Sequence, residues 1–573
     1  MRLNVVKSKN AEQLYIIKSF RKEDGKTTSR IVKKLGSMSS LLPYHNNDRE
    51  KVIAWGKEQA RILTEQESSE SMSVDITLSE SKQNKKGEKK LFQCGYLFPQ
   101  SIYYHLKMPE ICRKISSQHR IDYDLSDILA KLIYTRILTP DSKASSFQSA
   151  MDFLQPPSFE LHQIYRALSL LSKYSNEIQA ELYKNSLDVI ERNKGILYYD
   201  CTNYFFEIEE EKGSRKYGKG KEHRPNPIVQ MGLFMDGNGL PLAFTTFPGN
   251  ENEQPSLKPL EKKILQDFGL SKFIVCTDSG LASTDNRKFN NIQKRSFIVT
   301  QSLKTLKGHL KEWALDPQNW RMAGNSIEYN LDEIDEQNFM HSVFFKERWI
   351  NENGIEQRLI VSFSPKYKAY QRTVRQRQIE RAEKSVNKGQ PFQARNQNSP
   401  IRFIQEEAVT KDGEIAEEKA FFLNRGKIQE EENYDGFYGV CTTLEDDVKD
   451  ILQINKQRWQ IEAAFRTMKT EFKARPVYLQ RDERIEAHFL TCFIALLILR
   501  IIEKRLKEKY TTENVIRTLR KMQLHKFRGL GYMSSYERTD LTDDLHECFG
   551  FRTDTEFIST NTMKKIFKQT SRT

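Results

Sequence analysis

Three features of other protein classes are missing from this sequence of 573 residues. Its seven cysteines are scattered, with no Cys-x-x-Cys pair and no Cys/His cluster, which argues against structural zinc and disulfides and favours a reducing cytoplasm. The most apolar run, residues 489–499, is too short to span a bilayer and predicts a buried helix. The opening residues lack the apolar core of a signal peptide. We therefore expect a soluble, cytoplasmic protein with no membrane partner.

Charge points weakly to a polyanionic partner. Lys and Arg total 91 against 77 Asp and Glu, a formal net charge of +14. An excess of cations favours a partner such as nucleic acid, although this one is modest for the length of the chain.

The order of the patterns predicts several segments. One of them, residues 91–193, has a helical pattern. It is either a DNA-binding domain or a scaffold packed on the next domain, and the pattern does not decide between these two roles. The expected segments are an N-terminal β arm and polar linker (1–90), the helical domain (91–193), a strand-rich first half of a core (194–300), a β-rich and basic insertion (301–433), the second half of the core (434–525) and a C-terminal tail (526–573).

Two aspartates occupy the expected core strands. Asp200 is at the centre of the β-rich run 195–208, and Asp278 ends the short buried strand 272–280. A hairpin with an Asp-Gly-Asn-Gly turn at 236–239 and a helix over 252–268 lie between them. Adjacent central strands can bring such carboxylates together, and a buried Asp needs a partner or a ligand because its burial is costly.

A third acid lies on the segment 454–473, which we expect to be one amphipathic helix. One face is apolar, and Glu462 is the only acid on a second face that includes Arg458, Arg466 and Lys469. Glu462 is either part of a solvated face, paired with Arg458 and Arg466 at i,i+4, or a carboxylate that holds a metal between cations that hold phosphates. The presence of Asp200 and Asp278 on other elements favours the interpretation of Glu462 as a metal ligand.

The insertion contains a strongly basic segment. Residues 366–395 have nine Lys/Arg against two Glu and include Arg372, Arg375 and Arg377. Interleaved aromatic residues suit a groove that follows a phosphate backbone, and a solvated helix face is the alternative.

These motifs together resemble the DDE transposases of bacterial insertion sequences. The runs LYYDCTNYFFE, GLPLAFTTFPGNENEQPSL, IVCTDSGLAS and YDGFYGVCTT are similar to that family's strands in their order and spacing. The most similar subgroup has a β-rich insertion and a Tyr-x2-Arg-x3-Glu-x6-Lys signature. Here the signature positions are Asn455, Arg458, Glu462 and Lys469, so Asn replaces the usual Tyr.

The resemblance implies an α/β fold with a ribonuclease-H-like catalytic core, a mixed sheet with flanking helices interrupted by the insertion. It also implies that Asp200, Asp278 and Glu462 hold two Mg²⁺ ions, with Mn²⁺ as a substitute, which agrees with the preference of these hard cations for oxygen ligands. Water would free a 3′-hydroxyl at the element's end, and this hydroxyl would attack target DNA. The expected DNA contacts are Arg458, Arg466, Lys469, Lys219, Arg224 and the three insertion arginines.

The implied partners are the terminal inverted repeats of the element, the target duplex and a second copy of the chain, as a homodimer in the synaptic complex near the bacterial nucleoid. Two other functions remain open at this point. One is a ribonuclease-H-like nuclease without strand transfer. The other is an inactive, domesticated DNA-binding regulator, which would be expected to have lost a carboxylate.

Overall fold

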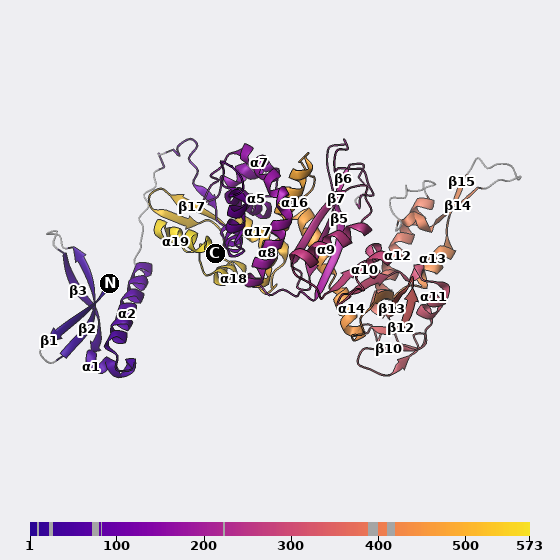
Figure 1. Cartoon of the computed structure of the whole chain (residues 1–573), viewed down its shortest axis with the longest axis horizontal. Coiled ribbons are helices and arrows are strands. Elements are labelled where there is room, and N and C mark those ends of the chain that lie inside the picture. Colours follow the sequence, from indigo (N-terminus) through magenta and orange to yellow (C-terminus); the bar gives the residue numbers. More distant parts are fainter. Residues whose placement is uncertain are drawn as a thin grey trace. The chain divides into compact units, whose positions relative to one another are not determined.

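The computed structural model describes residues 1–8, 11–21, 27–70, 80–81, 83–221, 224–387, 399–408 and 419–572. They form two compact units, Met1–Glu88 and Lys89–Thr573 (Figure 1). Each unit is described by itself below.

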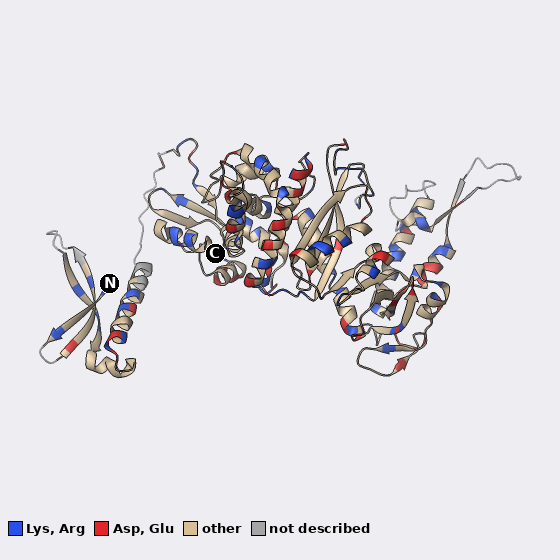
Figure 2. Ribbon diagram, in the orientation of Figure 1, with Lys and Arg blue, Asp and Glu red and all other residues tan. Residues whose placement is uncertain are grey.

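The N-terminal unit is a three-stranded antiparallel sheet with a helix on it. Leu14 and Val52 are fully buried between the sheet and the helix. The strands agree with the expected β arm, but the long helix was missed and extends to Glu70, into the segment predicted as a linker. In Figure 2 this helix carries both signs of charge. The elements are β1 (Arg2–Ser8), β2 (Ala11–Arg21), β3 (Thr27–Ser37), α1 (Met38–Leu41) and α2 (Arg49–Glu70).

The main unit contains a ten-stranded mixed sheet in the order β11-β10-β12-β13-β16-β9-β8-β5-β6-β7. Strands β5, β6 and β7 are antiparallel neighbours, whereas β5, β8 and β9 run parallel. The expected strand order of the core is therefore observed. The strands that matter below are β5 (Ile196–Phe205), β6 (Ile228–Asp236), β7 (Pro241–Pro248), β8 (Ile274–Thr277), β9 (Ser296–Gln301) and β16 (Phe437–Thr442).

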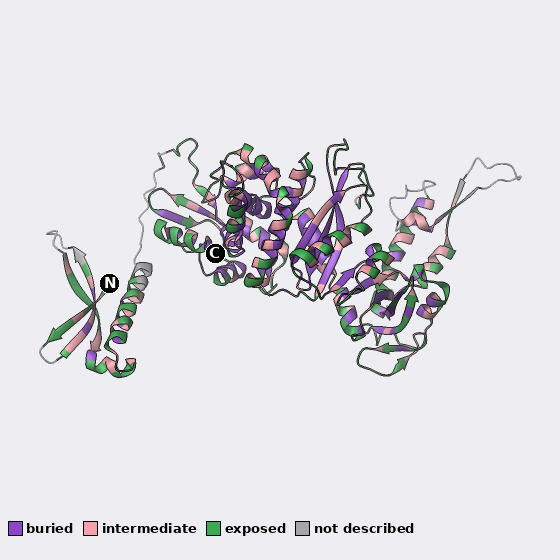
Figure 3. Ribbon diagram, viewed as in Figure 1, coloured by how far each residue is buried: buried purple, intermediate pink, exposed green. Residues whose placement is uncertain are grey.

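Helices cover both faces of the core sheet, so its central strands are buried (Figure 3). On β5, Tyr199 packs toward α9 (Leu257–Asp267). Its neighbour Tyr198 faces the opposite way, toward α14 (Val448–Lys456). Because side chains alternate along a strand, Asp200 shares the face of Tyr198.

The apolar run 489–499 lies in α16 (Asp482–Arg505), which confirms the predicted buried helix. The helix is long and apolar enough to cross a membrane, but 89% of its most apolar window is buried inside the protein. It packs against the helical segment, with which it shares one hydrophobic core. The segment consists of α3 (Leu97–His105), α4 (Met108–Ser116), α5 (Leu125–Leu138), α6 (Lys143–Ala150), α7 (Leu161–Lys173) and α8 (Ser175–Val189).

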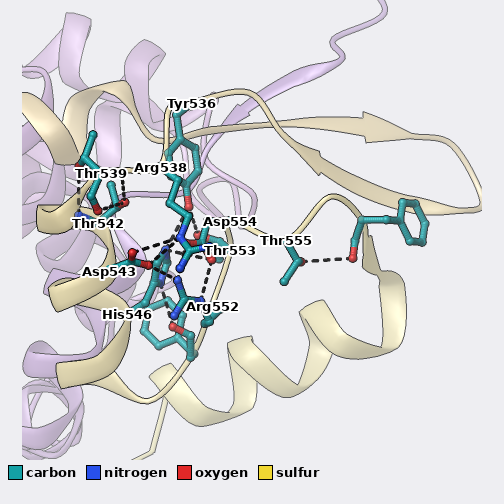
Figure 4. Close-up of polar contacts among 12 residues, drawn as sticks. Tyr536, Arg538, Thr539, Thr542, Asp543, His546, Arg552, Thr553, Asp554 and Thr555 are labelled. Atoms are coloured by element: carbon teal, nitrogen blue, oxygen red, sulfur yellow. Dashed lines mark hydrogen bonds and ion pairs between the residues drawn. The ribbon is translucent and has the colours of Figure 1, made fainter. Parts of the chain in front are cut away.

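The C-terminal segment is folded over residues 526–572, so the prediction of a tail was wrong. It joins a four-stranded sheet, β19-β18-β17-β4, whose first strand in the chain is β4 (Leu91–Gln93). Figure 4 shows the polar network that holds it, in which Arg552 contacts Asp543 and Asp554. The elements are α17 (Thr512–Lys521), β17 (Gln523–Phe527), β18 (Gly531–Ser534), α18 (Asp540–Phe549), β19 (Ile558–Ser559) and α19 (Thr560–Thr570).

The insertion extends the core sheet. Its strand β13 pairs with β16, which pairs on its other side with core strand β9. A separate hairpin, β14 with β15, projects from the insertion. The insertion elements are α11 (Gly308–Leu315), β10 (Trp320–Met322), β11 (Glu328–Tyr329), β12 (Phe344–Glu352), β13 (Ile355–Phe363), α12 (Pro365–Val386), β14 (Ile404–Ala408), β15 (Lys419–Leu423) and α13 (Arg425–Glu432).

Candidate active site

Asp200 and Asp278 face one another across two parallel strands. The β5–β8 ladder pairs Ile196 with Ile274 and Tyr198 with Cys276. The same offset, continued past the end of β8, places Asp200 opposite Asp278. Residues that are opposite in a parallel pair point to the same face of the sheet, so the two carboxylates are neighbours on the α14 side.

The pKa of Asp200 reflects this environment. Burial raises it to about 6, and the negative charge of Asp278 adds to the rise. Lys221, the backbone N–H of Cys201 and Arg458 oppose the shift. Part of the Asp278 carboxylate is already engaged, since Oδ1 accepts a hydrogen bond of 3.1 Å from the backbone N–H of Leu281.

Glu462 lies in the first turn of α15 (Trp459–Thr470), which contacts β5. The expected single helix over 454–473 is wrong, because a turn at Gln457 and Arg458 separates α14 from α15. The apolar face is confirmed: Ile461 and Met468 are fully buried. Glu462 itself is exposed and lines a cavity of about 400 Å³.

No ion pair within 4.0 Å joins Glu462 to a cation in the described part of the chain. The alternative of a face held together by pairs with Arg458 and Arg466 is therefore not observed. The cavity beside Glu462 is also lined by Arg458, Asn455, Tyr438 of β16 and Tyr367 of α12. The insertion thus contributes residues to the surroundings of the glutamate.

Asn455 connects the glutamate-bearing region to the strands. It is only 6% exposed. Its Nδ2 donates to the Tyr438 hydroxyl at 3.1 Å, and its Oδ1 lies 3.7 Å from Sγ of Cys276 on β8. The Tyr438 hydroxyl in turn lies 2.8 Å from Oγ1 of Thr300 on β9. The Asn455 side chain therefore links the end of α14 to β8 and β16 directly, and to β9 through Tyr438.

The family model of the transposase DDE domain matches residues 201–498, about half of the chain. The chain belongs to this family. The match includes Asp278 and Glu462 and begins directly after Asp200. No curated protein matches. Among solved structures, the piggyBac transposase synaptic complex with hairpin DNA is similar at 8% identity and a TM-score of 0.36 over 82% of both chains, a level too low to transfer any property.

The protein is thus a DDE transposase, an enzyme of DNA transposition whose partner is DNA. Family members use divalent metal ions, and the acids of this transposase fit such ions in chemistry, because carboxylate oxygens are the preferred ligands of hard cations. Within the described ranges, no three His, Cys, Asp or Glu side chains are close enough to hold a metal together. Two of the three expected acids are neighbours, and Glu462 would have to move toward them.

Two lysines of the transposase are close to Asp200. Lys469 was expected from the sequence; burial lowers its pKa to about 8, Lys221 lowers it further, and Asp200 opposes both. Lys221 was missed, although it is in the loop that supplied Lys219 and Arg224. Its Nζ donates to the backbone carbonyl of Cys201. Only the folding of that loop back onto β5 distinguishes Lys221 from its basic neighbours.

The remaining expected DNA contacts of the core are on the surface. Arg466 and Lys219 are exposed, and Arg458 is partly buried beside the cavity. The guanidinium of exposed Arg224 lies 4.3 Å from the centre of the Phe205 ring at the end of β5. These positions leave the cations accessible to a DNA backbone.

Arg375 is a correction to the predicted DNA contacts. It is 6% exposed on α12, and both terminal nitrogens bond to Asp435, which is 3% exposed; the Nη1–Oδ1 distance is 2.7 Å. A guanidinium that is buried and paired in this way is not available to phosphate. Arg372 and Arg377 are exposed on the same helix. Residues 388–395 of the basic segment lie outside the described residues.

Proposed function

We propose that this transposase cuts the ends of a bacterial insertion sequence and joins them to target DNA by a cut-and-paste route. The observation that carries the proposal is the effect of the Asp278 charge on buried Asp200, across the register of β5 and β8, with Lys221, Lys469 and Arg458 close enough to act on the Asp200 charge or on its neighbours. Carboxylates for a metal and cations for phosphates belong together at a site of phosphodiester chemistry.

We infer that strands β5–β9 are a ribonuclease-H-like core. Three antiparallel strands followed by two parallel ones, in the order β7-β6-β5-β8-β9, support this assignment. The place of the insertion, between β9 and β16, supports the subgroup with a β-rich insertion. Asn455 departs from the signature of that subgroup, and its burial makes it a positioning residue rather than a DNA contact.

In the proposed reaction, Asp200, Asp278 and Glu462 hold two Mg²⁺ ions, for which Mn²⁺ can substitute. Bound metal would stabilise charge on the attacking and leaving oxygens of an in-line displacement. Arg458, Lys469 and Lys221 neutralise the phosphates beside the scissile bond. The Asn455 hydrogen bonds keep α14, and so the start of α15, at a fixed distance from β8, which Asp278 directly follows. The enzyme would act as a homodimer in the synaptic complex, in the cytoplasm near the nucleoid.

The test uses Asp200→Asn, Asp278→Asn and Glu462→Gln, each in the full-length protein. Each amide keeps the shape but removes a charge, so strand cleavage in Mg²⁺ should fall by orders of magnitude while binding to the element ends persists. A double variant should be little worse than a single one, because the groups act as a unit. Calcium should support binding but not cleavage, because its coordination is larger and looser.

Asp450→Asn is a matched control, since Asp450 is an exposed carboxylate on neighbouring α14. It should leave cleavage unchanged. Near wild-type cleavage by Glu462→Gln would refute the assignment. Cleavage without joining to target DNA would leave a plain nuclease, and end-binding without any cleavage would leave a regulator.

A further inference from the structure

A small cavity lies away from the carboxylates, where the start of α6 meets the loop after α15. Its volume is about 80 Å³, far below the roughly 300 Å³ of a small-molecule site. Basic side chains line it from four parts of the chain: Arg136 from α5, Lys143 from α6, Lys473 from the loop after α15 and His488 from α16.

Lys143 lines this cavity, and its ammonium group contacts the imidazole of His488. It is 5% exposed, and its Nζ lies 3.5 Å from Nδ1 of His488. Nε2 of His488 lies 3.2 Å from the carbonyl oxygen of Ala474. Nε2 therefore carries the proton and Nδ1 accepts from Lys143, which leaves two N–H groups of the ammonium for another acceptor.

Arg136 is also incompletely satisfied. It is 3% exposed, and its terminal nitrogens donate to the carbonyl oxygens of Phe472 and Asp141 at 2.9 and 3.1 Å. Its Nε is buried without a hydrogen-bond partner. The side chain of Asp141, which also lines the cavity, accepts from the backbone N–H of Ser142 at 2.7 Å.

Across the described ranges, no carboxylate lies within 4.0 Å of the charged nitrogens of Lys143 or Arg136. Burying cations without an anion is costly, so such a cluster gains stability when an anion completes it. Burial and the charge of Arg136 lower the pKa of Lys143 to about 7, which is a measure of this cost. The N-terminus of α6, capped by Ser142, adds a favourable dipole for an anion.

We propose that this cavity, bounded by Arg136, Lys143 and Lys473, binds a backbone phosphate of the DNA on which the transposase acts. The proposal rests on the proposed function in that DNA supplies the anion. Exposed Lys473 and Tyr478, at the edge of the cavity, follow α15 directly. Glu462 is in the first turn of α15, which ends at Thr470, so the helical rise puts Glu462 about 12 Å from the end of the helix that leads into the cavity. A phosphate there would belong to a nucleotide near the scissile bond.

The first experiment measures how duplex binding by the full-length protein depends on salt. Each phosphate contact contributes about 0.9 to the slope of log K against log salt. Lys143→Met should lower the slope by about one and weaken binding at low salt. Lys473→Asn should act in the same direction; Lys473 has φ +44°, which Asn tolerates, so this variant decides the test if Lys143→Met fails to fold.

Lys346→Met is the matched control. Lys346 is equally buried, but its ammonium donates to the carbonyl of Asp316 at 2.7 Å and lies above the Trp320 ring. Its removal should leave the salt slope unchanged. An unchanged slope in both Lys143→Met and Lys473→Asn would overturn the proposal. Cleavage and end-binding by those variants would then show that the proposed function survives without it.

The second experiment distinguishes DNA phosphate from a free anion. Inorganic phosphate, at constant ionic strength, should raise the Tm of the DNA-free wild type more than that of Lys143→Met, since a ligand stabilises the state that binds it. In DNA-free buffer with chloride, Lys143→Met should melt above the wild type, because an unpaired buried cation is gone. A Lys143-dependent effect of phosphate with an unchanged DNA slope would assign the cavity to a free anion and refute the DNA contact.

Discussion

Asp278 directly follows strand β8, whose register with β5 places it opposite Asp200, and its charge adds to burial in raising the pKa of Asp200 to about 6. Two carboxylates held together in this way oppose each other's ionisation. The protein therefore maintains, at neutral pH, a local repulsion that a divalent cation would remove.

The first prediction concerns this repulsion. Asp200 has a higher pKa in the folded protein than its ordinary value of 3.8. Its contribution to stability is therefore complete below about pH 4 and is lost as pH rises through about 6. Asp200→Asn should not show this loss, so at pH 7.5 in EDTA it should be more stable than wild type by up to about 3 kcal/mol. At pH 4 the two proteins should be equal in urea unfolding. A variant that is less stable at both pH values would contradict the argument.

The second prediction concerns the departure from the signature. Asn455→Tyr restores the usual tyrosine, but Asn455 is buried between Cys276 and Tyr438. Overpacking of this kind costs about 1–3 kcal/mol, so we expect a lower free energy of unfolding and slower cleavage, with end-binding retained. Lys456→Tyr, at the exposed neighbouring position, is the control and should change neither quantity. A fully stable Asn455→Tyr would mean that the strand contacts are dispensable.

The third prediction follows from the buried pair of Arg375 and Asp435. Arg375→Gln leaves Asp435 buried without its cation, which should destabilise the protein by about 3–5 kcal/mol in urea unfolding. Arg381→Gln, an exposed position on the same helix, should cost less than about 0.5 kcal/mol. Equal stabilities for the two variants would contradict the structural role of Arg375 and leave it a candidate DNA contact.

The fourth prediction concerns the exposed arginines of α12. Neutralising Arg372 and Arg377 together should weaken binding to any duplex and lower the salt slope by about one unit for each phosphate that is no longer neutralised, while stability is retained. Arg372 is 3.8 Å from Asp435, but its exposure makes that ion pair weak. If the double variant keeps the wild-type slope, this surface of the helix is only solvated.

The sequence patterns located the core strands and the aspartates because burial and alternation are local signals. The same patterns could not locate what depends on distant partners. In the sequence Arg375 cannot be told apart from the other arginines of its segment, because its partner Asp435 lies 60 residues later in the chain. Lys221 is distinguished from its basic neighbours only by the fold of its loop. The C-terminal strands are short, and their sheet is completed by the pairing of β17 with β4, more than 400 residues earlier in the chain, so the pattern there indicated a tail. The break between α14 and α15 lies at Gln457 and Arg458. Neither residue is a glycine or a proline, so the sequence contains no signal of a helix break there.

Strand β16 has a consequence for the evolution and engineering of the chain. It is hydrogen-bonded to β9 of the core on one side and to β13 of the insertion on the other. Excising the insertion would leave the full length of β16 as an unprotected edge, the type of surface through which sheets aggregate. The insertion therefore shields the catalytic sheet from self-association, and a shortened descendant of this chain would need a replacement cover before it could lose that segment.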